Sequence, residues 1–66
     1  MGNKRFFRLL SESKHLSGTE IWVDLETGVK YLFHSSGYAG GMTPLLDKDG
    51  KPDIATEYEL NEYRYR

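Results

Sequence analysis

The segment from Ser35 to Gly41 combines residue types that can hold an anionic ligand. Its glycines would let backbone N–H groups approach an anion closely, and the adjacent hydroxyls add hydrogen-bond donors. Tyr38, in the same segment, could stack on a nucleotide base. The spacing matches neither the phosphate loop of nucleotide hydrolases nor the dinucleotide fingerprint. The alternative interpretation is that the glycines turn a tight corner between strands while Tyr38 fills the core.

A ligand site around this segment would also use residues from elsewhere in the chain. Trp22 offers a second stacking surface, and an arginine near a terminus can bind phosphate in bidentate fashion. One subunit of 66 residues is too small to enclose such a ligand, so we expect the site to lie between subunits. The expected ligand-binding residues are Ser35, Ser36, Gly37, Tyr38, Gly40, Gly41, Thr43, Trp22 and Arg5.

Catalytic chemistry finds little support in the sequence. His34 beside Ser35 suggests an activated hydroxyl, but neighbouring residues of a strand point to opposite faces, and no third residue is placed to orient the imidazole. The aspartates of the Asp47–Gly50 turn lack the spacing and the terminal glutamate of an EF-hand. Such turn aspartates usually hydrogen-bond the local backbone. We therefore expect no enzymatic activity.

Size and composition narrow the class of protein. A chain this short buries only about 60 % of its unfolded surface, so small domains need disulfides, a metal or oligomerisation. Cysteine is absent and the two histidines lie far apart in sequence, so we expect no metal site, no cofactor and a homo-oligomer. Nine aromatic residues favour a folded chain. The net charge of −1 argues against duplex nucleic acid or a membrane surface as partner, and without a targeting signal we expect a cytoplasmic protein.

The alternation of apolar and polar residues predicts a mainly β fold, a small antiparallel meander of three or four strands. Strands are expected over 5–12, 20–24 and 29–35, with a short edge strand at 42–46 and a loop at 37–41. If 20–24 and 29–35 pair as a hairpin, Ile21, Val23, Tyr31 and Phe33 share one apolar face. Trp22 then lies on the other face.

The C-terminal part differs in composition from the rest. We expect residues 1–53 to form the β domain and residues 54–66 a Tyr-rich extension that packs on the domain or on a partner subunit. Ile54, Tyr58 and Asn61 or Glu62 fall at helical spacing, which predicts a short helix or an ordered strap. The basic residues at the two termini could form a rim if the ends meet.

The run TEIWVDLETGVKYLFHSSGYAGGMTPLLDKDGKP, from Thr19 to Pro52, resembles a family of short domains of unknown function found in phages and Gram-positive bacteria. The shared pattern is VD-ETGV-YL----GYAGG-TPLLD-DGKP. The resemblance covers about half of the chain and implies a compact β-meander, with no established catalytic residues. By analogy with very small phage proteins, it suggests sequestration of the cyclic nucleotides used as immune signals, in the host-cell cytoplasm.

Two functions from different classes therefore stay open. The first is a non-enzymatic, oligomeric module that binds a small anionic ligand, a nucleotide or cyclic oligonucleotide, as an anti-defence sponge. The second is a protein-interaction module that inhibits a host protein through an exposed strand edge or the aromatic tail. A purely structural domain is a further alternative.

Overall fold

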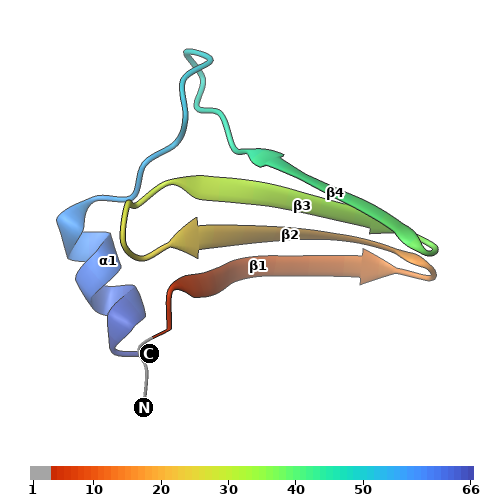
Figure 1. The fold of residues 1–66 in the computed structure, drawn as a ribbon, viewed down its shortest axis with the longest axis horizontal. Coiled ribbons are helices and arrows are strands. Elements are labelled where there is room, and N and C mark those ends of the chain that lie inside the picture. The colour runs from red at the N-terminus through yellow and green to blue at the C-terminus, as the bar shows by residue number, and fades with distance from the viewer. Residues whose placement is uncertain (1–3) are drawn as a thin grey trace.

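The chain folds as a single antiparallel sheet with one short helix at its C-terminal end, and the computed structural model describes residues 4–66. The strands follow one another across the sheet in the order β1-β2-β3-β4, as Figure 1 shows. Their bounds are Phe6–Lys14 for β1, Ser17–Asp24 for β2, Lys30–Ser36 for β3 and Ala39–Pro44 for β4; the helix α1 spans Glu57–Arg64. The predicted mainly β meander with a short C-terminal helix is confirmed.

The glycine-rich segment is a tight turn followed by a strand, so the predicted loop over 37–41 is wrong. Ser36 pairs with Ala39, which leaves only Gly37 and Tyr38 in the turn. Gly37 has a φ of 61°, and glycine at the first central position is typical of a type II′ hairpin turn. The backbone N–H of Gly37 donates to the carbonyl of Leu16 at 2.8 Å, so the β1–β2 and β3–β4 turns lie side by side at one end of the sheet (Figure 1).

The register between β2 and β3 overturns the expected apolar face. Trp22 lies opposite Tyr31, and Glu20 lies opposite Phe33. Residues that lie directly opposite one another share a face, so Tyr31 and Phe33 accompany Trp22 and not Val23. A difference of one residue in the connection between two strands exchanges every side chain between the faces. The connecting residues here include Gly28, whose φ is 84°.

The buried core lies at one end of the sheet, where α1 packs against it. It consists of Val23, Leu25, Ala55 and Leu60, with Phe7, Leu9 and Tyr63 packed around it. The rings of Phe7 and Tyr63 stack with their centroids 5.3 Å apart. Because Phe7 lies opposite Val23 in the sheet, the helix covers the face that carries these two residues, here called the Val23 face.

Helix α1 begins with a complete capping box. The Thr56 hydroxyl accepts from the backbone N–H of Glu59, and the Glu59 carboxylate accepts from the backbone N–H of Thr56. The bond from the Thr56 N–H lowers the pKa of Glu59. The buried side of the helix is marked by Leu60 and Tyr63, whereas Tyr58 is exposed, so the stripe expected from the sequence was misassigned.

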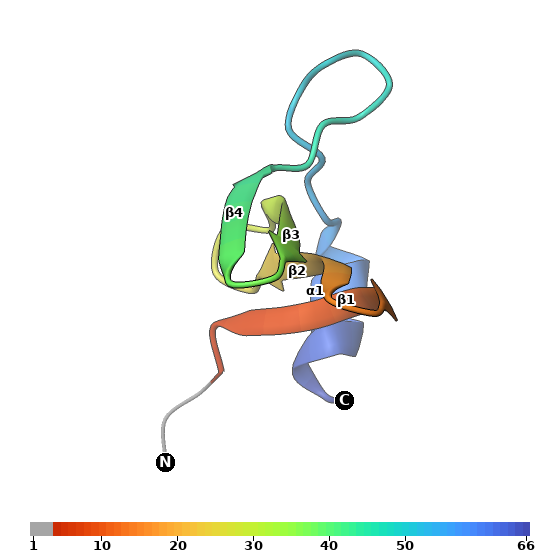
Figure 2. The ribbon, with the colours of Figure 1, turned by 90° about the vertical axis from the view of Figure 1, so that its right-hand side faces the viewer.

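Between β4 and α1 the chain makes a loop that stands away from the sheet, as Figure 2 shows. The Asp47 carboxylate accepts from the backbone N–H groups of Asp49 and Lys51, at 2.9 and 3.0 Å. This confirms the predicted role of the turn aspartate in holding local backbone. The chain then returns beside the start of β3, where Ile54 bridges to Val29.

Candidate functional site

The residues expected to form a ligand site are distributed over both faces and both ends of the sheet. Ser35, Gly40 and Trp22 belong to the face opposite the Val23 face. Ser36, Gly41 and Thr43 belong to the Val23 face. Within one subunit the structure brings together neighbours in the β3–β4 hairpin, but not the complete set.

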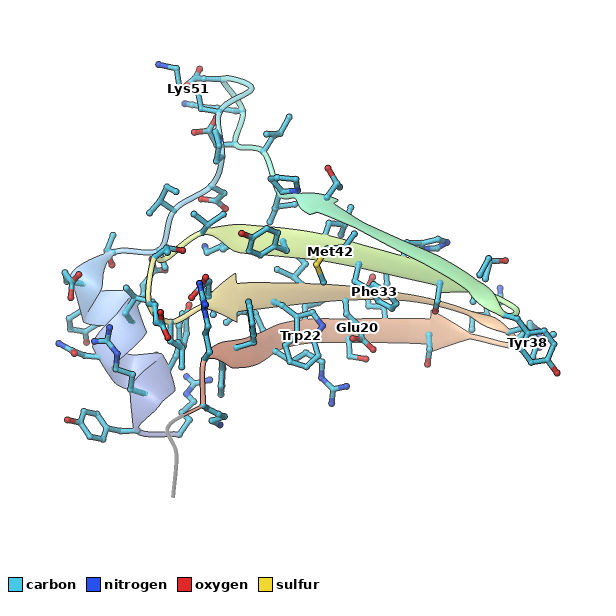
Figure 3. All side chains as sticks on the ribbon, viewed as in Figure 1. Glu20, Trp22, Phe33, Tyr38, Met42 and Lys51 are labelled. Carbon is cyan, nitrogen blue, oxygen red and sulfur yellow. The ribbon has the colours of Figure 1, made fainter. Side chains whose placement is uncertain are left out.

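Tyr38 lies at the hairpin tip, with its side chain fully exposed, as Figure 3 shows. It therefore does not fill the core, as the alternative interpretation would require. The amide of Gly37 already donates to Leu16, so it is not free to bind an anion in this conformation. At Gly40 a Cβ atom would lie 3.1 Å from Cζ of Phe33, so the absence of a side chain makes room for that ring.

Arg5 lies at the opposite end of the sheet from this tip, where it is engaged in an ion pair. Its Nη2 donates to the Asp24 carboxylate at 2.9 Å, and its Nε lies 3.2 Å from both oxygens of that carboxylate. The Asp24 side chain is almost completely buried. The hydrogen bonds from Arg5 are the largest cause that lowers the pKa of Asp24 to about 2, aided by the backbone N–H of Glu26. Arg5 therefore has a structural role in the fold.

The face opposite the Val23 face carries most of the large apolar side chains of the sheet that α1 does not cover. We call it the aromatic face. Its apolar residues come from all four strands, and none of them is fully buried. They are Phe6, Trp22, Tyr31, Phe33, Met42 and Pro44.

The middle of the aromatic face combines apolar side chains with one paired charge of each sign. Figure 3 shows Trp22, Glu20, Phe33 and Met42 across the middle of β2, β3 and β4. The Trp22 indole N–H donates to Glu20 at 2.8 Å, and the Arg8 guanidinium lies 5.9 Å from the centre of the Trp22 ring. Arg8 and Glu20 also pair at 3.8 Å. Arg8 and Glu20 therefore place one charge of each sign beside the apolar side chains of this surface.

Sequence reasoning included Trp22 among the candidates but missed Tyr31, Phe33 and Met42 as its neighbours. The alternation within β2 and β3 was predicted correctly, and the error lay in how these two strands were aligned. In β4, residues 39–41 were expected in a loop. A signal was available in Gly40, because glycine inside a strand often marks a close approach of another group.

The side chain of His34 takes part in a hydrogen bond between neighbouring strands. Nδ1 of His34 shares a hydrogen bond of 2.9 Å with Oγ1 of Thr19 across the strand pair. Within residues 4–66 no cluster of three or more metal-ligating side chains occurs. Over the same residues, no helix is long and apolar enough to cross a membrane.

Comparison with known proteins identifies a family. A family model described as a family of unknown function, DUF6440, matches residues 5–55. The match contains all four strands and ends at Ala55, directly before the helix cap. The search of curated proteins found no match, and neither did the search of solved structures. Because the match covers most of the length of the chain, the chain belongs to the DUF6440 family of unknown function.

Proposed function

We propose that the chain is a non-enzymatic protein-binding module whose binding surface is the aromatic face. The observation that carries the proposal is the gathering of aromatic side chains and a methionine on the face that α1 leaves uncovered. Met42 and Phe6 expose 60 % and 47 % of their surface. Contiguous apolar surface of this kind is typical of protein interaction sites.

The composition of the face favours a protein over a nucleic acid. Trp, Tyr and Arg are the residues most enriched at the energetic centres of protein interfaces, and methionine adapts to irregular partners. Single-stranded nucleic acids also stack on aromatic side chains of sheets, but they require a positively charged groove. Here Glu20 lies in the middle of the face and pairs with Arg8. The chain as a whole carries a net charge of −1.

Site-specific photocrosslinking in the organism that encodes the chain tests this surface. A photoreactive phenylalanine analogue is placed at Phe6, on the aromatic face, or at Tyr58, on the exposed side of α1. Both are exposed aromatic positions, so both variants should fold. We expect a crosslink to a different protein from position 6 and none from position 58.

The purified partner then provides a quantitative test. Phe6→Ala should weaken its binding about tenfold or more, the loss expected for an interface anchor, whereas Tyr58→Ala should leave the affinity unchanged. Trp22 is the only tryptophan of this chain, so the change in emission on mixing, after subtraction of the partner's own emission, reports contact at the aromatic face. Equal crosslinking from both positions, or equal effects of both alanine substitutions, would refute the proposal.

Sequestration of a nucleotide or cyclic oligonucleotide is the second candidate function. The support for it is the position of the Arg8 guanidinium over the Trp22 ring, which places a positive charge and an aromatic ring within reach of one ligand. A thermal-shift assay against cyclic and linear nucleotides separates the two functions, since a ligand that binds the folded state raises the melting temperature. A rise in melting temperature that persists in Trp22→Phe and is lost in Arg8→Ala would favour nucleotide sequestration over protein binding.

A further inference from the structure

The two edges of the sheet differ in how well they are protected from pairing with another strand. β1 carries Arg8, Glu12 and Lys14, and its register shifts between Arg8 and Leu10. Charges and bulges of this kind discourage strand addition at an edge. β4 has no charged residue and no irregularity in its register, and all six of its residues are exposed. The β4 edge is therefore the one open to another strand.

The hydrogen-bonding groups on the free side of β4 follow from the hairpin turn. In a two-residue hairpin, the residues that flank the turn, here Ser36 and Ala39, are bonded to each other, and bonded and non-bonded pairs alternate from there. Leu45 N–H donates to the Lys30 carbonyl at 2.9 Å, which continues the same alternation. The N–H and C=O groups of Gly40 and Met42 therefore point outward, and Pro44 ends the row of donors.

Gly41 has no role within its own subunit that requires a glycine. Its φ is not positive, and a Cβ atom there would meet nothing within 4 Å. Glycine weakens a strand interior, and where it occurs it often marks the close approach of another backbone. Gly37 and Gly40, by contrast, are explained by the turn and by the Phe33 ring.

We propose that β4 pairs antiparallel with β4 of a second copy of this chain, with Gly41 opposite Gly41 on the two-fold axis. This register places the outward groups of Gly40 opposite those of Met42 in the second copy, and the reverse, so every outward donor and acceptor of these residues is satisfied. Moving the axis to Met42 would place Gly40 opposite Pro44, which has no N–H to donate. Of these two registers, the one centred on Gly41 pairs all the outward groups of Gly40 and Met42.

The side chains fit the same register. Each Met42 lies over a Gly40 that has no side chain, and beside the Phe33 ring that this glycine accommodates. A methionine sulfur beside an aromatic ring is a favourable contact. The register also sets the exposed Tyr38 opposite Pro44 of the second copy. Because the two-fold axis is perpendicular to the sheet, the two aromatic faces lie on the same side and form one surface.

A cysteine at the axis tests the pairing and its register. The chain has no cysteine, and Gly41 lies in open space, so Gly41→Cys adds a single thiol without a clash. Opposed residues of a non-bonded pair have Cα atoms about 4.5 Å apart, within the range a disulfide spans. We expect Gly41→Cys to oxidise to a covalent dimer, whereas Thr43→Cys, whose opposite residue is Ala39, stays a monomer on a denaturing gel run without reductant.

Charged substitutions at Gly41, tested one at a time and then mixed, are the second test of the pairing. Like charges directly opposite one another destabilise a strand pair, so Gly41→Lys and Gly41→Glu should each raise the dimer dissociation constant about fivefold or more in sedimentation experiments. An equimolar mixture should recover dimer, with one copy of each variant. A wild-type chain that sediments at its monomer mass of 7.6 kDa at every concentration would overturn the proposal, as would failure of both the crosslink and the charge exchange. Gly41 is on the Val23 face, so these outcomes leave the proposed binding function of the aromatic face to its own test.

Discussion

Replacing Asp24 with asparagine removes the only buried charge among the described residues. Asp24 is 2 % exposed and accepts hydrogen bonds from the Arg5 guanidinium and from the backbone N–H of Glu26, the latter at 2.8 Å. It thereby joins the start of β1 to the end of β2 and to the turn that follows. An amide at this position keeps the shape of the side chain but loses the ionic part of these interactions.

The size of the effect follows from the pKa of Asp24. Its ordinary value of 3.8 is lowered to about 2 in the folded chain, which corresponds to about 2 kcal/mol of stability at neutral pH. Because the folded-state pKa is the lower one, this stability is fully present above the unfolded value and is lost as the pH falls through about 2. Roughly half of it should be left at pH 3.

Urea unfolding followed by the emission of Trp22 measures this contribution across the pH range. At pH 7 we expect Asp24→Asn to lower the free energy of unfolding by about 2 kcal/mol, and the gap from the wild type should close between pH 4 and pH 2. Asp49→Asn, in the exposed turn of the protruding loop, is the matched control. It should change neither the free energy of unfolding at pH 7 nor its dependence on pH. Parallel pH curves for wild type and Asp24→Asn would refute the reasoning, as would a carboxyl titration midpoint for Asp24 near 3.8 in NMR.

Three further substitutions test the backbone and the core by thermal unfolding. Gly28→Ala should cost about 2 kcal/mol, because the φ of 84° strains a side chain and its Cβ would lie 3.1 Å from the Ala55 carbonyl oxygen. His15→Gly should stabilise the chain by about 0.5–1 kcal/mol, since His15 has a φ of 55° and glycine adopts it without strain. Leu60→Ala should cost about 2–5 kcal/mol and leave much of the chain unfolded at room temperature, because α1 would lose its one buried side chain. An unchanged melting temperature would contradict the backbone angle described for Gly28 or His15, or the burial described for Leu60.

The alternation of apolar and polar residues predicted the first three strands well, whereas the start of β4 was expected in a loop, and alternation could not fix how the strands align. The alternation places Tyr31 and Phe33 on one face of β3 whatever β3 pairs with. Whether that face joins Trp22 or Val23 depends on one residue in the connection after Asp24. Nothing in the side-chain pattern decides it, because both faces contain apolar residues. Alternation alone therefore could not predict the aromatic face, and Gly40 was the available signal that a neighbouring ring lies close to β4.

The start and the buried side of the helix were not predicted, although the sequence contained a signal for the start. Thr56 followed three residues later by Glu59 is a capping box, and it marks the start of α1 where the structure places it. The apolar spacing of Ile54 and Tyr58 drew attention to exposed residues instead. In a helix of eight residues the capping box is more informative than the apolar spacing, because one buried position, Leu60, and one partly buried position, Tyr63, are too few to define a period.

The extent of the family match bears on where a shared function would reside. Residues 5–55 contain the complete sheet, including the aromatic face and the β4 edge, but not α1. The helix contributes Leu60 and Tyr63 to the Val23 face, so its role in this chain is to complete a core. The family match therefore excludes the segment that completes this core and includes both proposed binding surfaces. We therefore expect a function common to the family to depend on Trp22, Phe33 and the β4 edge, and to survive changes on the exposed side of α1.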